Sequence, residues 1–153
     1  MNGQPQQLDH AGIAALVPHS GSMCLLEALL GWDEQHIRCT TRTHLRPDNP
    51  LRSASGLLAT CAIEYGAQAM ALHGALLARA AGTWAQPGYL ASARGVTLHR
   101  LRLDDLDGPL DVSAERLAGD AQQILYAFAV SHAGEPVAEG RAAVVLNTPL
   151  ALP

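Results

Sequence analysis

One long apolar stretch, Ser53 to Ala81, limits most strictly what this chain can fold into. Its residues are almost all Ala, Leu, Ile, Met and Gly, so the predicted helix has apolar surface all the way round, which is typical of a helix buried on every side. Ser53 or Ser55 is expected to cap its start, because a serine oxygen accepts hydrogen bonds from the free N–H groups of the first turn. Gly82 is expected to end it. The rest of the chain must therefore supply layers that cover this helix.

A single acid, Glu64, lies in the middle of the predicted helix. A carboxylate in apolar surroundings loses hydration, which favours its neutral, protonated form. Gln68 follows four residues later, on the same helical face and within reach. Two interpretations stand: a buried acid satisfied by a structural partner, and a general acid, since perturbed acids gather at functional sites. A membrane span would have to bury Glu64, Gln68, His73 and Arg79, which argues against it although the length suffices.

Composition and charge exclude several classes of function. The 153 residues predict one domain, residues 1–153, with residues 1–9 as a polar leader. A net charge of −4 argues against a nucleic-acid partner, and the absence of lysine excludes P-loop and Schiff-base lysines. Cys24, Cys39 and Cys61 are too far apart for a metal or redox motif, and their odd number without a signal peptide indicates reduced thiols in the cytoplasm.

The segments around the helix read mainly as strands. A short helix over 11–16, capped by Asp9, and a helical turn followed by a strand over 23–30 are expected first. Alternation then predicts a strand over 35–44, and the proline-rich residues 45–52 form a loop that leads into the helix. Four more strands, expected as a meander, are predicted over residues 89–103, 110–117, 123–132 and 136–146.

Short connections make neighbouring strands antiparallel, and a sheet with one apolar face must cover that face. The long helix is the only large apolar object available for this. The sequence therefore predicts an α+β hotdog fold, an antiparallel sheet curled around one long central helix. One sheet cannot wrap such a helix completely, so the exposed remainder and the sheet edge favour a two-fold pair of copies.

Elimination leaves few candidates for chemistry. No G-x-S-x-G nucleophile motif, no G-x-G-x-x-G dinucleotide motif and no histidine pair at metal-ligand spacing is present, so neither a cofactor nor a metal is expected. What remains is His44, at the end of the predicted strand, and Glu64. A histidine and a buried acid beside one pocket can act as a general acid–base pair near pH 7. The alternative for His44 is an ordinary loop histidine.

Several segments resemble a known family. LVPHSGSMCLLEAL, residues 16–29, resembles the Leu-Pro-His opening of beta-hydroxyacyl-acyl-carrier-protein dehydratases, and GLLATCAIEYGAQAM resembles their central helix, in which Gln follows the catalytic Glu by four residues. Asn49-Pro50-Leu51-Arg52 and residues 63–74 resemble most closely a divergent bacterial branch found with aryl-polyene pigment synthesis. The common dehydratases place their catalytic histidine in Gly-His-Phe-Pro, fewer residues before the Glu than the 20 that separate His44 from Glu64.

The resemblance implies a substrate and roles for residues. The substrate would be a 3-hydroxyacyl thioester on the 4'-phosphopantetheine arm of an acyl carrier protein. His44 would remove the proton next to the thioester carbonyl, Glu64 would protonate the departing hydroxyl, and a trans-2-enoyl thioester would form. The Gly56 N–H, or that of Ala59, at the helix start would donate to the thioester carbonyl. Gln68 and His19 would contribute to the substrate pocket.

The resemblance also implies a homodimer in which His and Glu of one site come from different subunits. Two other functions stay open: an acyl thioesterase on the same fold, and a non-catalytic partner that pairs with an active paralogous dehydratase. Seven arginines either include a docking patch for the acidic carrier protein or are ordinary solvated charges. They are Arg38, Arg42, Arg46, Arg52, Arg94, Arg100 and Arg102.

Overall fold

A computed structural model describes residues 6–18, 21–83 and 88–146. Two helices, three short 3-10 turns and six strands follow one another along the chain. In order they are α1 (His10–Ala14), η1 (Gly21–Met23), β1 (Ala28–Trp32), β2 (His36–Thr41), η2 (Thr43–Leu45), η3 (Ala59–Cys61), α2 (Ala62–Ala80), β3 (Gly88–Leu98), β4 (Leu110–Gly119), β5 (Gln123–His132) and β6 (Glu135–Leu146).

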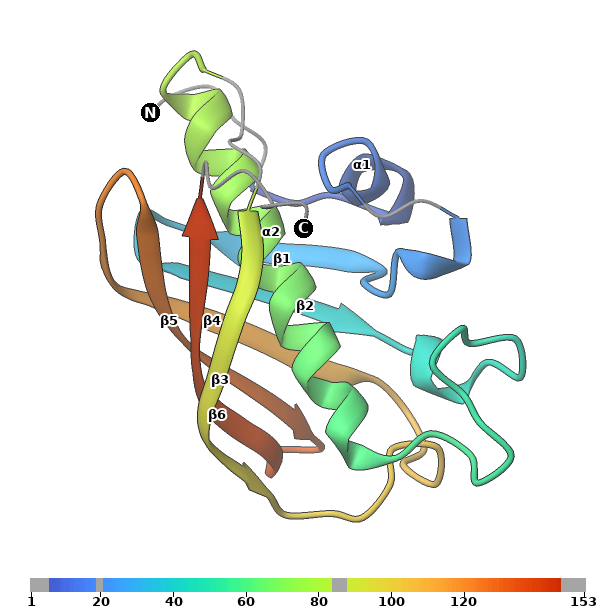
Figure 1. The fold of residues 1–153 in the computed structure, drawn as a ribbon. Helices are drawn as coiled ribbons and strands as arrows, with labels where there is room; N and C mark the ends of the chain where they lie inside the picture. Colours follow the sequence, from blue (N-terminus) through green and yellow to red (C-terminus); the bar gives the residue numbers. More distant parts are fainter. Residues whose placement is uncertain (1–5, 19–20, 84–87, 147–153) are drawn as a thin grey trace, which may run out of the picture.

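The six strands form one antiparallel sheet in the order β1-β2-β4-β5-β6-β3, and α2 crosses one of its faces (Figure 1). Alternate residues of β4 and β5 point at the helix and are buried, among them Val112, Tyr126 and Phe128. Gly66 lets α2 approach closely, because a Cβ there would lie 2.8 Å from the Phe128 ring. This arrangement confirms the predicted hotdog fold.

The strand order corrects one prediction. β4, β5 and β6 form the expected meander, but β3 pairs with β6 at the edge of the sheet and not with β4. Residues 99–109 carry the chain from that edge back to the start of β4. β3 is exposed along its length, with none of its residues buried. The sheet therefore ends in a long strand that this chain leaves uncovered.

The start of the long helix also differs from the prediction. α2 begins at Ala62, not at Ser53, and no side chain caps it. Ser53 and Gly56 instead close a tight turn through two backbone hydrogen bonds, in which Gly56 has a φ of +91°. The next residues pair with the segment after β3, where Leu103 N–H donates to Leu57 O and Ala59 N–H to Leu101 O. This long-range pairing replaces the first two turns of the expected helix.

A glycine follows the end of α2, and one side of this helix stays partly open. The Gly82 N–H donates to Arg79 O with a φ of +73°, so Gly82 follows the helix end as predicted. In one chain α2 is not buried on every side. A stripe along it stays half-exposed, and we call it the α2 stripe: Ile63, Glu64, Ala67, Ala71, Gly74 and Ala78. No described helix has the length and hydropathy needed to cross a membrane.

Candidate active site

Gln68 ties the first turns of α2 to the segment that precedes β1. Its buried side chain accepts a hydrogen bond from Leu25 N–H through Oε1 at 2.8 Å and donates to Met23 O through Nε2 at 2.8 Å. The same Nε2 also donates to Glu64 Oε1 at 3.3 Å. The predicted contact between Glu64 and Gln68 is thus confirmed. Glu64 itself lies in the first turn of α2 and is half-exposed, so the expectation of a fully buried acid in mid-helix is wrong for the single chain.

A buried polar cluster continues from this point. Tyr65, next to Glu64, shares a hydrogen bond of 2.8 Å between its Oη and Thr43 Oγ1, and its Oη accepts from Asn49 Nδ2 at 3.1 Å. Asn49 Nδ2 also donates to Thr43 O at 2.9 Å. Thr43 Oγ1 donates to Leu25 O at 2.7 Å. The cluster joins the loop after β2 to α2 and fixes the residue that precedes His44.

His44 occupies the 3-10 turn η2 and is fully buried, which rules out an exposed loop histidine. Its Nε2 lies 2.8 Å from Leu106 O. Because a carbonyl only accepts, Nε2 carries the proton and the ring nitrogen left with a lone pair is Nδ1. Nδ1 is buried without a hydrogen-bond partner among the described residues. Burial lowers the pKa of His44, and the His132 charge lowers it further, while the Leu106 hydrogen bond and the charges of Glu27 and Asp104 raise it.

Gly56 does not occupy the position expected of a donor to the thioester carbonyl. It lies in the turn before η3, and its N–H already donates to Ser53 O at 3.0 Å. The Ala59 N–H is likewise used, by Leu101 O. Gly56 serves a different end, because a Cβ there would stand 2.2 Å from Arg102 Nη2 and 2.4 Å from Asp104 Oδ2. The missing side chain makes room for that ion pair.

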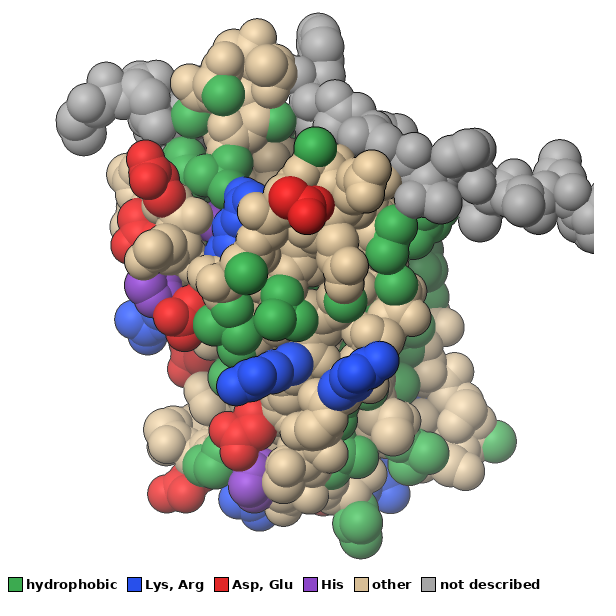
Figure 2. Space-filling view, turned by 60° about the vertical axis from the view of Figure 1, so that its left-hand side comes forward, with side chains coloured by type: hydrophobic (Ala, Val, Ile, Leu, Met, Phe, Trp, Pro, Cys, Tyr) green, Lys and Arg blue, Asp and Glu red, His purple; other side chains and the backbone are tan. Residues whose placement is uncertain are grey.

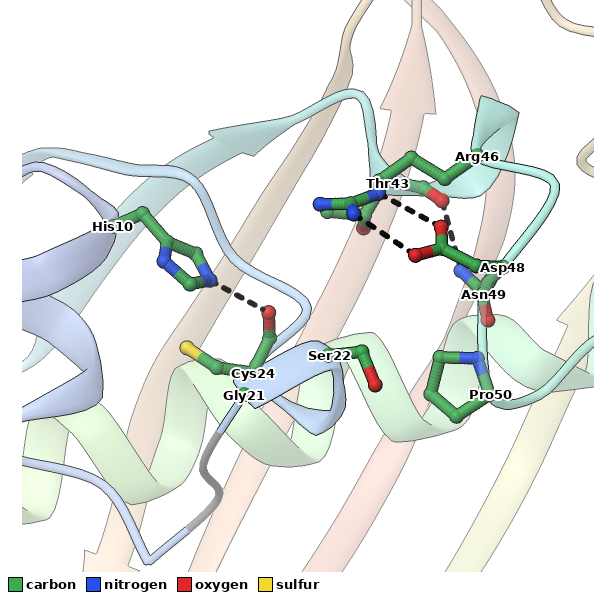
Figure 3. Close-up of a pocket in the computed structure, with 9 residues that line it drawn as sticks. All are labelled: His10, Gly21, Ser22, Cys24, Thr43, Arg46, Asp48, Asn49 and Pro50. Carbon is green, nitrogen blue, oxygen red and sulfur yellow. Dashed lines mark hydrogen bonds and ion pairs between the residues drawn. The ribbon is translucent and has the colours of Figure 1, made fainter.

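Two cavities lie near these groups. One of about 170 Å³ opens between η1 and the loop after η2 (Figure 3). Its lining mixes polar and apolar atoms, and the polar ones are already paired: His10 binds Cys24 O, Arg46 pairs with Asp48, and Asn49 donates to Thr43 O. The other, of about 270 Å³, lies between η3 and the end of β3 and is lined by residues 58–60 and 98–101. Both are smaller than the roughly 300–1,000 Å³ of most ligand pockets.

Among the described residues no hydrogen bond or ion pair joins His44 and Glu64. Their neighbours are linked by two routes: Thr43 bonds to Tyr65, and Thr43 also bonds to Leu25 O, while the Leu25 N–H donates to Gln68, which binds Glu64. His19 lies outside the described residues. The described part of the chain holds no cluster of three or more His, Cys, Asp or Glu side chains that could bind a metal.

Sequence reasoning missed three residues that shape the site. Tyr65 and Asn49 organise the polar cluster, and Asp104 anchors the turn that holds His44. Asn49 had a signal, since Asn49-Pro50-Leu51-Arg52 carried the resemblance, but nothing in the sequence paired it with Tyr65. Asp104 had none, because its ion pair with Arg52 and the link from its neighbour Arg102 to Ser55 O join segments about 50 residues apart in the chain.

Several solved structures are similar to this chain. The chain is similar to a chain of the dehydratase heterocomplex ApeI:P from Xenorhabdus doucetiae, with 21% identity, a TM-score of 0.79, and 89% of this chain and 91% of that chain covered. It also resembles a hypothetical thioesterase with coenzyme A from Streptococcus pneumoniae TIGR4, at 13% identity and a TM-score of 0.56, over 80% and 87% of the two chains. A thioesterase mutant from Staphylococcus aureus aligns at 12% identity and a TM-score of 0.59, over 78% and 92%.

These structural alignments show a shared fold. No curated protein sequence matches. The family of ApeP dehydratases does match, over residues 11–151, which is nearly the whole chain. This match confirms the resemblance to the divergent dehydratase branch. The protein therefore belongs to the ApeP-like dehydratase family.

Proposed function

We propose that this protein takes part in dehydrating 3-hydroxyacyl thioesters, carried on an acyl carrier protein, to trans-2-enoyl thioesters. Family membership supports the dehydratase class. The observation that carries the proposal is the buried His44 imidazole, whose Nε2–H is held by Leu106 O and whose Nδ1 has no partner among the described residues. A neutral imidazole with a free, oriented lone pair is a general base.

In the proposed reaction His44 Nδ1 takes the proton from the carbon next to the thioester carbonyl. The electron pair of that C–H bond forms the new C=C bond as the C–O bond at carbon 3 breaks. Glu64 gives its proton to the departing hydroxyl, which leaves as water. Gln68 holds the Glu64 carboxyl through Nε2, so it is a positioning residue and its amide need not touch the substrate. Gly56 is not kept as a donor, because its N–H is already bonded.

We propose that the complete site forms between two chains. One chain leaves two neighbouring surfaces open: the exposed edge strand β3 and the half-exposed α2 stripe, which includes Glu64. The cavity between η3 and the end of β3 lies at this edge and one turn before Glu64, and Leu58, Leu98 and Leu101 at its walls are exposed. A second chain placed there would enlarge that cavity and cover an acyl chain along α2.

The second chain is either another copy or a paralogue. One of the similar solved structures, ApeI:P, is a dehydratase heterocomplex. Pairing with a paralogue is therefore a specific alternative to the homodimer. Basic side chains do not form one continuous patch on the face shown in Figure 2, so docking of an acidic carrier protein is proposed for the assembled pair and not for this face alone.

The test is mass spectrometry of carrier-bound 3-hydroxyacyl groups after incubation with the protein, alone and with its paralogue. Wild type is expected to remove one water per acyl group. His44→Ala and Glu64→Gln are each expected to slow this by about 100-fold or more, the usual worth of a general acid or base. His36→Ala and Glu115→Gln, at an exposed pair 3.7 Å apart on β2 and β4, are the matched controls and keep wild-type activity.

Other outcomes discriminate the alternatives. Release of a free acid from the carrier would show a thioesterase. Activity only in the presence of the paralogue would support the heteromeric pair, and if His44→Ala and Glu64→Gln then had no effect this chain would be a non-catalytic partner. Activity that survives His44→Ala but not Glu64→Gln would move the base elsewhere, with His19 as the first residue to test.

A further inference from the structure

Charged side chains surround the turn over residues 103–106, whose Leu106 carbonyl accepts the hydrogen bond from His44. The Leu106 carbonyl belongs to a turn closed by the Leu106 N–H, which donates to Leu103 O at 3.1 Å. This turn lies in the connection between β3 and β4, 62 residues away from His44 in the chain. Because a single carbonyl selects which imidazole nitrogen carries the proton, the position of this turn decides where the lone pair of His44 points.

Asp104 is the centre of these charged side chains. Its carboxylate receives two hydrogen bonds from Arg102, from Nε and from Nη2, each at 2.7 Å, and lies 3.5 Å from Arg52 Nη1. The backbone of Leu57 also helps to lower the pKa of this carboxylate. Only 11% of the Asp104 side chain is exposed, so these contacts are partly shielded from solvent. The Arg102 guanidinium holds the pKa of Asp104 down at about 2, so the carboxylate stays charged throughout the physiological range.

The same charges bind the turn to the segment before α2. Arg102 Nη2 also donates to Ser55 O at 3.0 Å, next to Gly56, and the backbone hydrogen bond from Leu103 to Leu57 runs alongside. Arg52 is inserted although its Nε is buried without a partner among the described residues, which costs stability. The turn over residues 103–106 is thus fixed by two arginines, Arg52 and Arg102, and by Asp104, and Gly56 leaves room for them.

We propose that Asp104, held by Arg52 and Arg102, is a positioning residue for His44: it fixes the turn whose Leu106 carbonyl accepts the hydrogen bond from Nε2–H and so keeps Nδ1 free as the base. The inference rests on the proposed function for its catalytic consequence, but the tautomer itself is a property of the folded chain. Glu27 acts on the imidazole through charge and does not bind Leu106, whereas His132 also holds this turn, through a hydrogen bond from its Nε2 to Asp107 O, next to Leu106.

The experiment measures the tautomer directly. In ¹⁵N-labelled protein, long-range ¹H–¹⁵N correlation spectra distinguish a protonated Nε2 from a protonated Nδ1, and the His44 signals are those missing from His44→Gln. Wild type is expected to show the Nε2–H form alone. Asp104→Asn, and as a second variant Arg102→Gln, are expected to show both forms. Asp111→Asn, which breaks the exposed 3.8 Å pair with Arg38 on β2 and β4, is the matched control and leaves the spectrum unchanged.

Kinetics of the same variants supply the second readout. Both site variants are expected to lower kcat by about 10- to 100-fold with little change in KM, as when a partner that orients a functional imidazole is removed. A single Nε2–H form in folded Asp104→Asn and Arg102→Gln would overturn the proposal, whatever their activity. Mixed tautomers in the variants of a protein that dehydrates no substrate would uphold the positioning and reject the proposed function.

Discussion

Among the described residues, two histidines are fully buried, and each is held by a backbone carbonyl distant in sequence. His44 donates to Leu106 O, and His73 on α2 lies 2.8 Å from Asp33 O through Nε2. His73 Nδ1 then accepts a hydrogen bond from Tyr126 Oη at 2.8 Å. Burial raises the pKa of Tyr126 to about 12, so its hydroxyl keeps its proton and remains a donor. His73 has both nitrogens satisfied, whereas His44 has one free. That difference separates a structural histidine from a candidate base.

Burial makes both histidines a source of acid sensitivity. Desolvation lowers the pKa of His44 and of His73 in the folded chain. Below about pH 6.5 the unfolded chain therefore binds protons that the folded chain does not. As the pH is lowered further, the free energy of unfolding decreases, by at most about 1.4 kcal/mol per pH unit for each histidine, until the folded-state pKa is reached. Urea unfolding between pH 7.5 and 5.5 measures this slope.

The two residues can be separated in this measurement. His73→Gln and His44→Gln are each expected to flatten the fall in stability, while His99→Gln, at an exposed histidine, keeps the wild-type slope. A slope that none of these substitutions changes would assign the acid sensitivity to carboxylates instead.

Gly56 gives a second prediction for a single residue. Gly56→Ala places a Cβ against Arg102 and Asp104, in addition to the strain of a φ of +91°. Gly134→Ala, at a φ of +81° with no atom within 4 Å of the new Cβ, carries the strain alone and is the control. We expect Gly134→Ala to cost about 1 kcal/mol of unfolding free energy and Gly56→Ala to cost about 1–3 kcal/mol more. Equal costs, measured by thermal unfolding, would mean that the ion pair tolerates the methyl group.

At the scale of elements, the spacing of residues in the sequence correctly predicted those features that depend on contacts between near neighbours in the chain. The alternation of the strands, the end of α2 just before Gly82 and the contact between Glu64 and Gln68 all follow from spacings of a few residues. The start of α2 does not follow from such spacings, because residues 57–59 pair with residues 101–103 and are not helical. The burial of His44 depends on the same distant connection. β3 was misplaced for a similar reason, since its partner β6 is the last strand of the chain.

Two glycines of α2 test how the element is packed. Gly66 faces β5, and an added Cβ would lie within 2.8 Å of Phe128, so Gly66→Ala is expected to destabilise the chain by about 1–3 kcal/mol. Gly74 lies on the α2 stripe, where a Cβ meets nothing within 4 Å, so Gly74→Ala is expected to stabilise by about 0.5–1 kcal/mol through helix propensity. Thermal unfolding of the two variants checks the opposite signs. Destabilisation by Gly74→Ala would reveal a neighbour packed against that position.

At the scale of the whole molecule, the sheet ends in a strand that a single chain leaves open. Such an edge offers unpaired N–H and C=O groups to another strand, and natural proteins usually shield it with charge, bulges or a partner. β3 carries exposed Tyr89, Leu90 and Leu98 instead, beside the open α2 stripe. The sequence predicted a pair of copies from the incomplete cover of the helix, but only the strand order identifies β3 as the edge where the partner is expected.

Lysines on β3 test this assembly. The double variant Leu90→Lys, Leu98→Lys places charges at two positions that are 41% and 40% exposed in one chain, where a partner strand would bury them. We expect light scattering to show a shift from a pair of chains to single chains, with an unchanged far-ultraviolet circular dichroism spectrum. Dehydration should be lost with the pair, because the site proposed to form between two chains is then incomplete. Leu117→Lys on β4, at a leucine that is 41% exposed, is the matched control and keeps both assembly and activity. A double variant that is monomeric yet fully active would place the complete site within one chain.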